Sequence, residues 1–135
     1  MNTREAFAAV ALAAVACDGS LGREEARALR SQLEFRAPYR DLDEQAMGDL
    51  FDGLLSRLRQ SDWRSLLREA VPALDPAQQE TCLAMAAQLV RCDRVVQPAE
   101  EELLEQLAQE MSLPEGRAAQ ILDVIAVLNR DSLAG

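Results

Sequence analysis

The chain repeats one pattern, first as AAVALAAVACDGSLGREE at residues 8–25 and then, 75 residues later, as LAMAAQLVRCDRVVQPAE at residues 83–100. Each copy is typical of an apolar helix, a Cys-Asp turn and a second helix that opens with acids. Cysteine, aspartate and a later glutamate recur in register, as Cys17-Asp18 with Glu25 and as Cys92-Asp93 with Glu100. We therefore predict two equivalent helical hairpins, over about residues 5–35 and 80–110, related by a pseudo-twofold axis.

The remaining sequence is also typical of helix. No stretch sustains the alternation of apolar and polar residues expected of a strand, and β-branched residues are sparse. Start and stop signals divide the chain into about seven helices, with N-terminal caps expected near Asn2 and at Asp41, Ser61, Asp75 and Ser112. The sequence predicts an all-α fold, a compact bundle that forms one domain over residues 1–135.

Small residues mark a close helix contact in the first repeat. Ala9, Ala13 and Ala16 lie on one narrow stripe of the first predicted helix, and Ala86 and Ala87 mark the counterpart in the second repeat. Small side chains let two helix axes approach nearer than the usual separation of about 8–10 Å. We expect this stripe to be buried.

Composition excludes several functional classes. The chain has 23 acidic residues, 14 arginines, no lysine and no histidine, for a formal net charge of −9. An acidic chain does not neutralise phosphates, so we expect no nucleic-acid partner. The absence of histidine removes the Ser-His-Asp and Cys-His pairs, and no carboxylate pair is flanked by a nucleophile or a phosphate-binding loop. We expect no enzymatic activity.

Charge is unevenly distributed between the two halves of the chain. The net charge is −2 over residues 1–70 and −7 over residues 71–135. Four arginines border the junction of the third and fourth predicted helices, and we expect them to form a solvated face that pairs with local acids: Arg57, Arg59, Arg64 and Arg68.

The three cysteines predict a reducing compartment. The chain has an odd number of cysteines, and their spacing does not match a zinc site: Cys17, Cys82 and Cys92. This pattern favours free thiols and a cytoplasmic location. A redox or soft-metal role for Cys17 and Cys92 is the alternative. Each lies near a predicted helix C-terminus, where the macrodipole disfavours a thiolate, and neither belongs to a C-x-x-C pair. We expect buried structural thiols.

No segment is predicted to span a membrane. The longest apolar run, residues 6–17, has twelve residues, whereas a bilayer needs about 20. Residues 14–17 weakly resemble a lipoprotein cleavage box, but Arg4 and Glu5 leave the preceding stretch without net positive charge. Association with a peripheral membrane complex stays open as an alternative.

The first Cys-Asp turn carries a family resemblance. Residues 16–21, ACDGSL, followed by Glu25 resemble the A-x-D-G-x-hydrophobic-x-x-x-E signature of the TerB-like tellurite-resistance family. The second copy, CDRVV at residues 92–96 with Glu100, resembles a degraded form, and LAQEMSL at residues 107–113 resembles the closing segment of the family. The resemblance covers roughly residues 5–115. It implies an all-helical, internally duplicated fold with clustered acids, in a family that has no established catalytic activity and is linked to tellurite and chemical stress, metal ions and membrane-associated complexes.

The acidic turns are the candidate metal site. Carboxylate oxygens suit a hard divalent cation, and the candidate ligands are Asp18, Glu24 and Glu25 in the first turn and Asp93 and Glu100 in the second. So few carboxylates imply weak binding, with a dissociation constant of about 10⁻⁴–10⁻³ M. Gly19 permits a tight first turn, whereas Arg94 offers Asp93 an internal counter-ion. We expect the first turn to be the better site.

Helix capping is the alternative role for the same acids, and the two roles do not exclude each other. If Gly22 and Gln97 are N-caps, Glu25 and Glu100 occupy the third helical position, where a carboxylate accepts from the cap N–H. Acids there also oppose the positive end of the helix macrodipole. A standard EF-hand is excluded because alanines occupy its first and third loop positions, at residues 14 and 16.

Two functions therefore stay open. The first is a TerB-like stress-response module that docks an unidentified partner protein and binds a divalent cation weakly through its acidic turns. The second is a protein–protein interaction domain that binds no ion. No further cofactor is expected, and the sequence does not indicate an oligomeric state.

Overall fold

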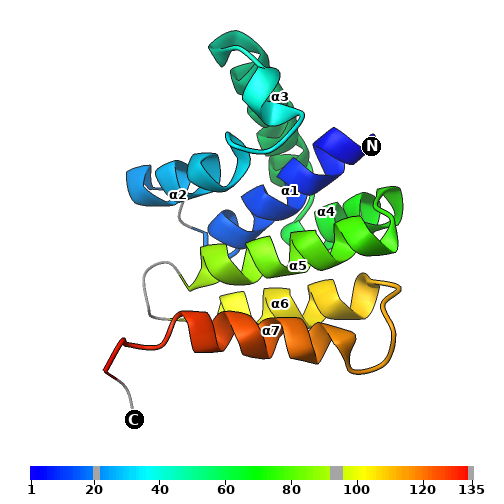
Figure 1. Ribbon diagram of the computed structural model, residues 1–135. Helices are drawn as coiled ribbons and strands as arrows, with labels where there is room; N and C mark the ends of the chain where they lie inside the picture. The colour runs from blue at the N-terminus through cyan, green and yellow to red at the C-terminus, as the bar shows by residue number, and fades with distance from the viewer. Residues whose placement is uncertain (20–21, 92–95, 134–135) are drawn as a thin grey trace.

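The computed structural model describes residues 1–19, 22–91 and 96–133, and within these ranges it contains helices and no strand (Figure 1). The seven helices are α1 (Thr3–Ala16), α2 (Arg23–Leu33), α3 (Glu44–Gln60), α4 (Trp63–Ala70), α5 (Pro76–Val90), α6 (Pro98–Glu110) and α7 (Arg117–Leu128). Two 3₁₀ turns, η1 (Tyr39–Asp41) and η2 (Val71–Ala73), lie between them. The predicted all-α fold of about seven helices is confirmed.

Helix α1 lies at the centre of the bundle. Ten consecutive residues, Ala6–Val15, are all buried, so no side of the helix faces water along this stretch. Helices α2, α3, α4 and α5 all pack against it. A helix that is apolar all round is stable only inside a core, and the alanines let its four neighbours approach closely. The predicted burial of the alanine stripe is confirmed for Ala9 and Ala13, and Ala16 is half-buried.

The two repeats form the two hairpins α1–α2 and α5–α6, and α5 packs against α1 (Figure 1). A third helix accompanies each hairpin, since α3 packs on α1 and α7 packs on α5. The superposition of residues 8–33 on residues 83–108 stays a prediction. The second Cys-Asp turn lies outside the described residues, together with Cys92, Asp93 and Arg94, as do Ser20 and Leu21 of the first turn.

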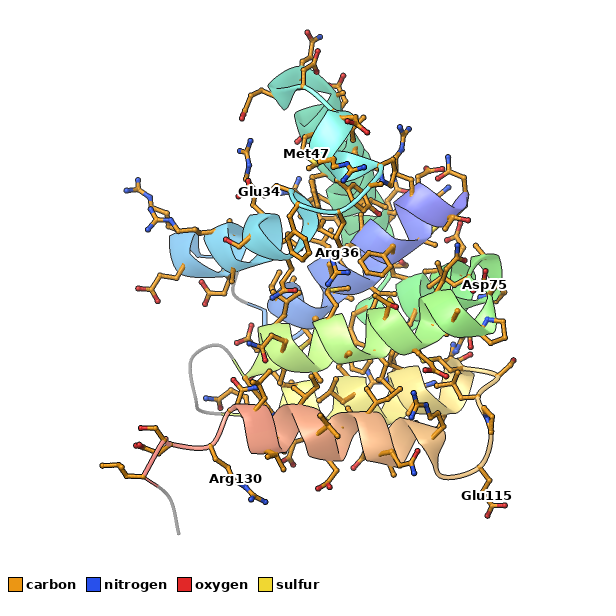
Figure 2. All side chains as sticks on the ribbon, viewed as in Figure 1. Glu34, Arg36, Met47, Asp75, Glu115 and Arg130 are labelled. Atoms are coloured by element: carbon orange, nitrogen blue, oxygen red, sulfur yellow. The ribbon has the colours of Figure 1, made fainter. Side chains whose placement is uncertain are left out.

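Two predicted caps form as expected. The Asn2 side chain accepts from the N–H of Glu5 (2.8 Å), and the Glu5 carboxylate accepts from the N–H of Asn2 (3.2 Å). Asp75 and Gln78 make the same reciprocal pair at the start of α5, where Asp75 lies at the exposed end of the helix (Figure 2). Each pair satisfies backbone donors that the first helical turn leaves without partners.

Three predicted caps are wrong. Asp41 ends the η1 turn, and Asp43 caps α3 instead by accepting from the N–H of residue 46 (2.7 Å). Ser61 turns back to donate to the carbonyl of residue 57 (3.0 Å), so Asp62 caps α4 and its pKa is lowered by the N–H of residue 65. Ser112 does not cap α7, which begins after Gly116 at φ 82°.

A buried glutamine joins three segments. Gln79, on α5, is only 4% exposed. Its side-chain amide donates to the carbonyl of Leu74, after η2 (3.0 Å), and its Oε1 accepts from the N–H of Ser112, after α6 (2.9 Å). One side chain therefore satisfies backbone groups in the segment before α5 and in the segment after α6.

Arginines of the first half pair with acids of both halves. Arg57 pairs with Glu69 on α4, as the expectation of local acids requires. Arg64 pairs with Glu102, and Arg68 approaches Glu110 (3.6 Å), so the partners of these two lie on α6. The excess of acid in the second half is thus partly offset across the α4–α6 contact. Within the described ranges, no helix has the length and apolar character needed to cross a membrane.

Candidate functional site

The glutamates of the acidic turns lie at helix N-termini. Gly22 and Gln97 are the N-caps of α2 and α6, as predicted. The N–H of Gln97 donates to Oε1 of Glu100 (2.9 Å), and Glu100 is only 8% exposed. Oε2 of Glu25 lies 2.7 Å from the position that a Cβ on Gly22 would occupy, so Glu25 folds back over its cap. Capping is confirmed for Glu100.

Acids from both repeats act on one thiol. Burial, the nearby Glu100 carboxylate and the adjacent Asp18 raise the pKa of Cys17 to about 12. Glu100 lies in the first turn of α6 and Cys17 follows the last residue of α1, so the start of α6 lies near the end of α1. A thiol with this pKa stays protonated at neutral pH and is a poor nucleophile and metal ligand. Burial also raises the pKa of Cys82, which agrees with structural roles for both thiols.

The predicted cation ligands are only partly brought together. Asp18 and Glu24 are exposed, Glu25 is half-buried, and Gly19 has the positive φ (85°) expected of a tight turn. Within residues 1–19, 22–91 and 96–133, no group of three or more acids and cysteines is arranged to hold a metal ion. Asp93 lies outside these ranges. The cation site therefore stays a prediction.

The outer face of α7 is apolar and exposed. Val124 is 63% exposed, Leu128 is 66% exposed, and Val127 is 48% exposed. Leu133, beyond the helix, is 92% exposed. We call these four residues the α7 patch. Helix α7 lies on the outside of α5, and none of its residues is fully buried (Figure 1).

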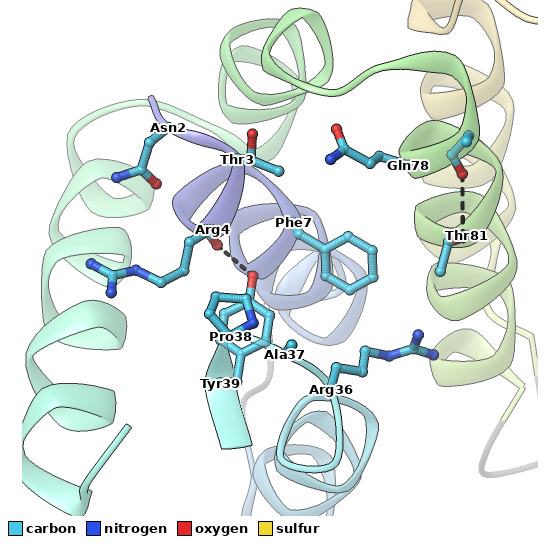
Figure 3. Close-up of a pocket in the computed structure, with 11 residues that line it drawn as sticks. Asn2, Thr3, Arg4, Phe7, Arg36, Ala37, Pro38, Tyr39, Gln78 and Thr81 are labelled. Carbon is cyan, nitrogen blue, oxygen red and sulfur yellow. Dashed lines mark hydrogen bonds between the residues drawn. The ribbon is translucent and has the colours of Figure 1, made fainter. Parts of the chain in front are cut away.

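A cleft opens at the other end of α5. It has a volume of about 810 Å³ and lies between the first turns of α1, the segment 36–39 and the first turns of α5 (Figure 3). Phe7 and Tyr39 line the cleft with aromatic rings. The Tyr39 hydroxyl donates to the backbone carbonyl of Arg4, which fixes the ring in place. The Arg36 side chain enters from the loop after α2.

Sequence reasoning missed both of these surfaces. A signal for the α7 patch was present, because seven of the eight residues 121–128, ILDVIAVL, are apolar, which is more than one buried stripe requires. The cleft left no local signal. Its walls come from three segments that only the packing of α1 against α5 brings together.

One family model matches the chain, over residues 4–126, and its description is tellurite resistance protein TerB. No curated protein and no solved structure matches.

Proposed function

The chain belongs to the TerB family, whose model covers residues 4–126, and on this premise we propose that it is a non-enzymatic domain that docks a partner protein through the α7 patch. The exposed aliphatic side chains of α7 carry the proposal. Val124, Val127 and Leu128 lie three and four residues apart on one face of α7, and exposed apolar residues that share a face are typical of protein–protein contact sites. The chain has a formal net charge of −9, which disfavours indiscriminate association.

The chemistry of the patch fits a helical or extended apolar segment of a partner. Val124 also lines a shallow hollow of about 260 Å³ between α5 and α7, together with Ile121 and Ile125. Arg117 borders this hollow and is already paired with Glu80 (2.8 Å). An apolar centre with a polar rim is the usual anatomy of an interface.

The absence of histidine and the raised pKa of Cys17 support a role without catalysis. The neutral Cys17 thiol is part of the packing near the end of α1, and the Glu100 carboxylate caps the start of α6, so both groups have structural roles. A scaffold of this kind contributes a rigid surface rather than a reacting group.

Site-specific crosslinking tests the docking proposal. A photo-crosslinking residue at Val127 should capture one protein in the native cells, whereas the same residue at the exposed Gln109 of α6 should not. The captured protein, once purified, should bind the wild-type domain at least about tenfold more tightly than the double variant Val124→Ser/Leu128→Ser, because central apolar contacts dominate interface energies. Equal binding by the wild type and the double variant would refute the α7 patch as the docking surface.

We also propose that the first acidic turn binds a divalent cation weakly, as the alternative to an interaction domain without an ion. At a dissociation constant of about 10⁻⁴–10⁻³ M, 10 mM calcium or manganese should stabilise the wild type by about 1–3 kcal/mol. Asp18→Asn should abolish this shift in melting temperature, and Asp93→Asn should reduce it less.

Glu25→Gln separates ion binding from capping. An amide still accepts from a cap N–H, so capping alone predicts almost unchanged stability and no ion-dependent shift in any variant. Thermal melts of the wild type and the three variants, with and without the ion, measure both effects. If no melt moves with the ion, the domain is an interaction module without a metal, and the docking proposal is unaffected.

A further inference from the structure

The lining of the cleft has positive charge and no negative charge. Eleven residues line it, and among them only the side chains of Arg4 and Arg36 are charged at neutral pH. The chain as a whole has a net charge of −9, so a cleft without a single acidic side chain differs from the average surface. Such a lining favours an anion over a cation.

Arg36 is positioned to donate to a ligand. Its Nε donates to the carbonyl of Gln32 (2.7 Å), and its guanidinium lies over the rings of Phe35 (4.7 Å) and Phe7 (5.6 Å). These contacts fix the guanidinium while leaving its terminal nitrogens for another partner. Among the described residues no acid forms an ion pair with Arg36. In Figure 3 its side chain extends toward α5, and Arg4 extends to the opposite side of Phe7.

The facing wall, from α5, offers donors. Oε1 of Gln78 is occupied by the N–H of Asp75 (2.9 Å), which leaves the side-chain NH₂ group to donate. Thr81 lies one turn further along, with its hydroxyl donating to the carbonyl of Ala77 (3.2 Å). Between this wall and Arg36, Phe7 presents an apolar surface (Figure 3).

We propose that the cleft binds an organic carboxylate with a short apolar body. The planar guanidinium of Arg36 matches a carboxylate with two parallel hydrogen bonds. The apolar body lies on Phe7, Ala37 and Pro38. A volume of about 810 Å³ accommodates a chain of eight carbons with room to spare. This ligand site does not depend on the α7 patch.

Calorimetric titration and amide chemical-shift mapping test the proposal with octanoate and with octanamide, its neutral counterpart. Octanoate should bind and shift the amide signals of Gln78 and Thr81, whereas octanamide should bind about tenfold or more weakly, which is the loss expected when charge-assisted hydrogen bonds are removed. The carboxylate could belong to a small organic acid or to the carboxyl terminus of a peptide. Binding of acetyl-Leu-Leu, compared with binding of its C-terminal amide, distinguishes these two sources.

Variants locate the binding to the cleft. Arg36→Gln should weaken octanoate binding about tenfold or more, whereas Arg40→Gln, an exposed arginine of η1 outside the lining, should leave it unchanged. Thr81→Trp places a large side chain at an exposed wall position and should abolish binding without loss of stability, which keeps the test valid if Arg36→Gln folds poorly. Equal affinity for octanoate and octanamide, or binding that survives Thr81→Trp, would overturn the proposal, as would the absence of binding by either carboxylate at millimolar concentration.

Discussion

Replacing Gln79 with leucine is expected to lower the free energy of unfolding by about 1–3 kcal/mol, because it leaves the buried carbonyl of Leu74 without a donor and removes the acceptor of the partly buried N–H of Ser112. Each unsatisfied buried group costs about 1–3 kcal/mol, and the greater hydrophobicity of leucine recovers only part of this cost. Denaturant unfolding followed by circular dichroism measures the change.

Gln109→Leu is the matched control for this substitution. Gln109 is exposed on α6, so the same chemical change there should alter stability by less than about 0.5 kcal/mol. If Gln79→Leu were as stable as this control, the segments after η2 and after α6 would not depend on Gln79 for their hydrogen bonds.

Ala13→Leu is expected to destabilise the protein by about 1–3 kcal/mol, through overpacking of the core. Ala13 is fully buried on α1, and helices pack against α1 on all sides. The added carbons find no space without displacement of a neighbouring helix. The change in melting temperature measures the effect, and Ala26→Leu on the exposed face of α2 provides the control. A melting temperature equal to that of the wild type would mean that the contact around Ala13 is loosely packed.

Periodicity and capping chemistry predicted the number and the approximate ranges of the helices, because these signals are local. The errors arose where two suitable caps lie close together. Ser61 and Asp62 are adjacent, and both side chains can cap a helix. The choice depends on the backbone, which turns the Ser61 hydroxyl back to α3 and points the Asp62 carboxylate at α4. No local pattern distinguishes these two outcomes.

Long-range contacts explain the other differences between prediction and structure. Ser112 resembles a cap in sequence, but its N–H is held by Gln79, 33 residues earlier, and α7 starts only after Gly116. Glu100 was predicted both as a cap and as a candidate ligand, and the cap is visible because its partner, Gln97, is only three residues away. Its proximity to Cys17 depends on how the hairpins pack, which the repeat suggests but does not determine.

The burial of α1 on every side has a consequence for biosynthesis. The ribosome makes α1 before α5, and residues 17–75 lie between the two helices. At roughly 5–20 residues per second, the apolar helix waits for about 3–12 s before α5, the last of its four helix neighbours, begins to appear. During this interval the segment Ala6–Val15 has no polar face to turn toward water. We therefore expect the nascent chain to be prone to aggregation until α5 is complete, and slow translation between α4 and α5 should increase aggregation more than the same delay after α6.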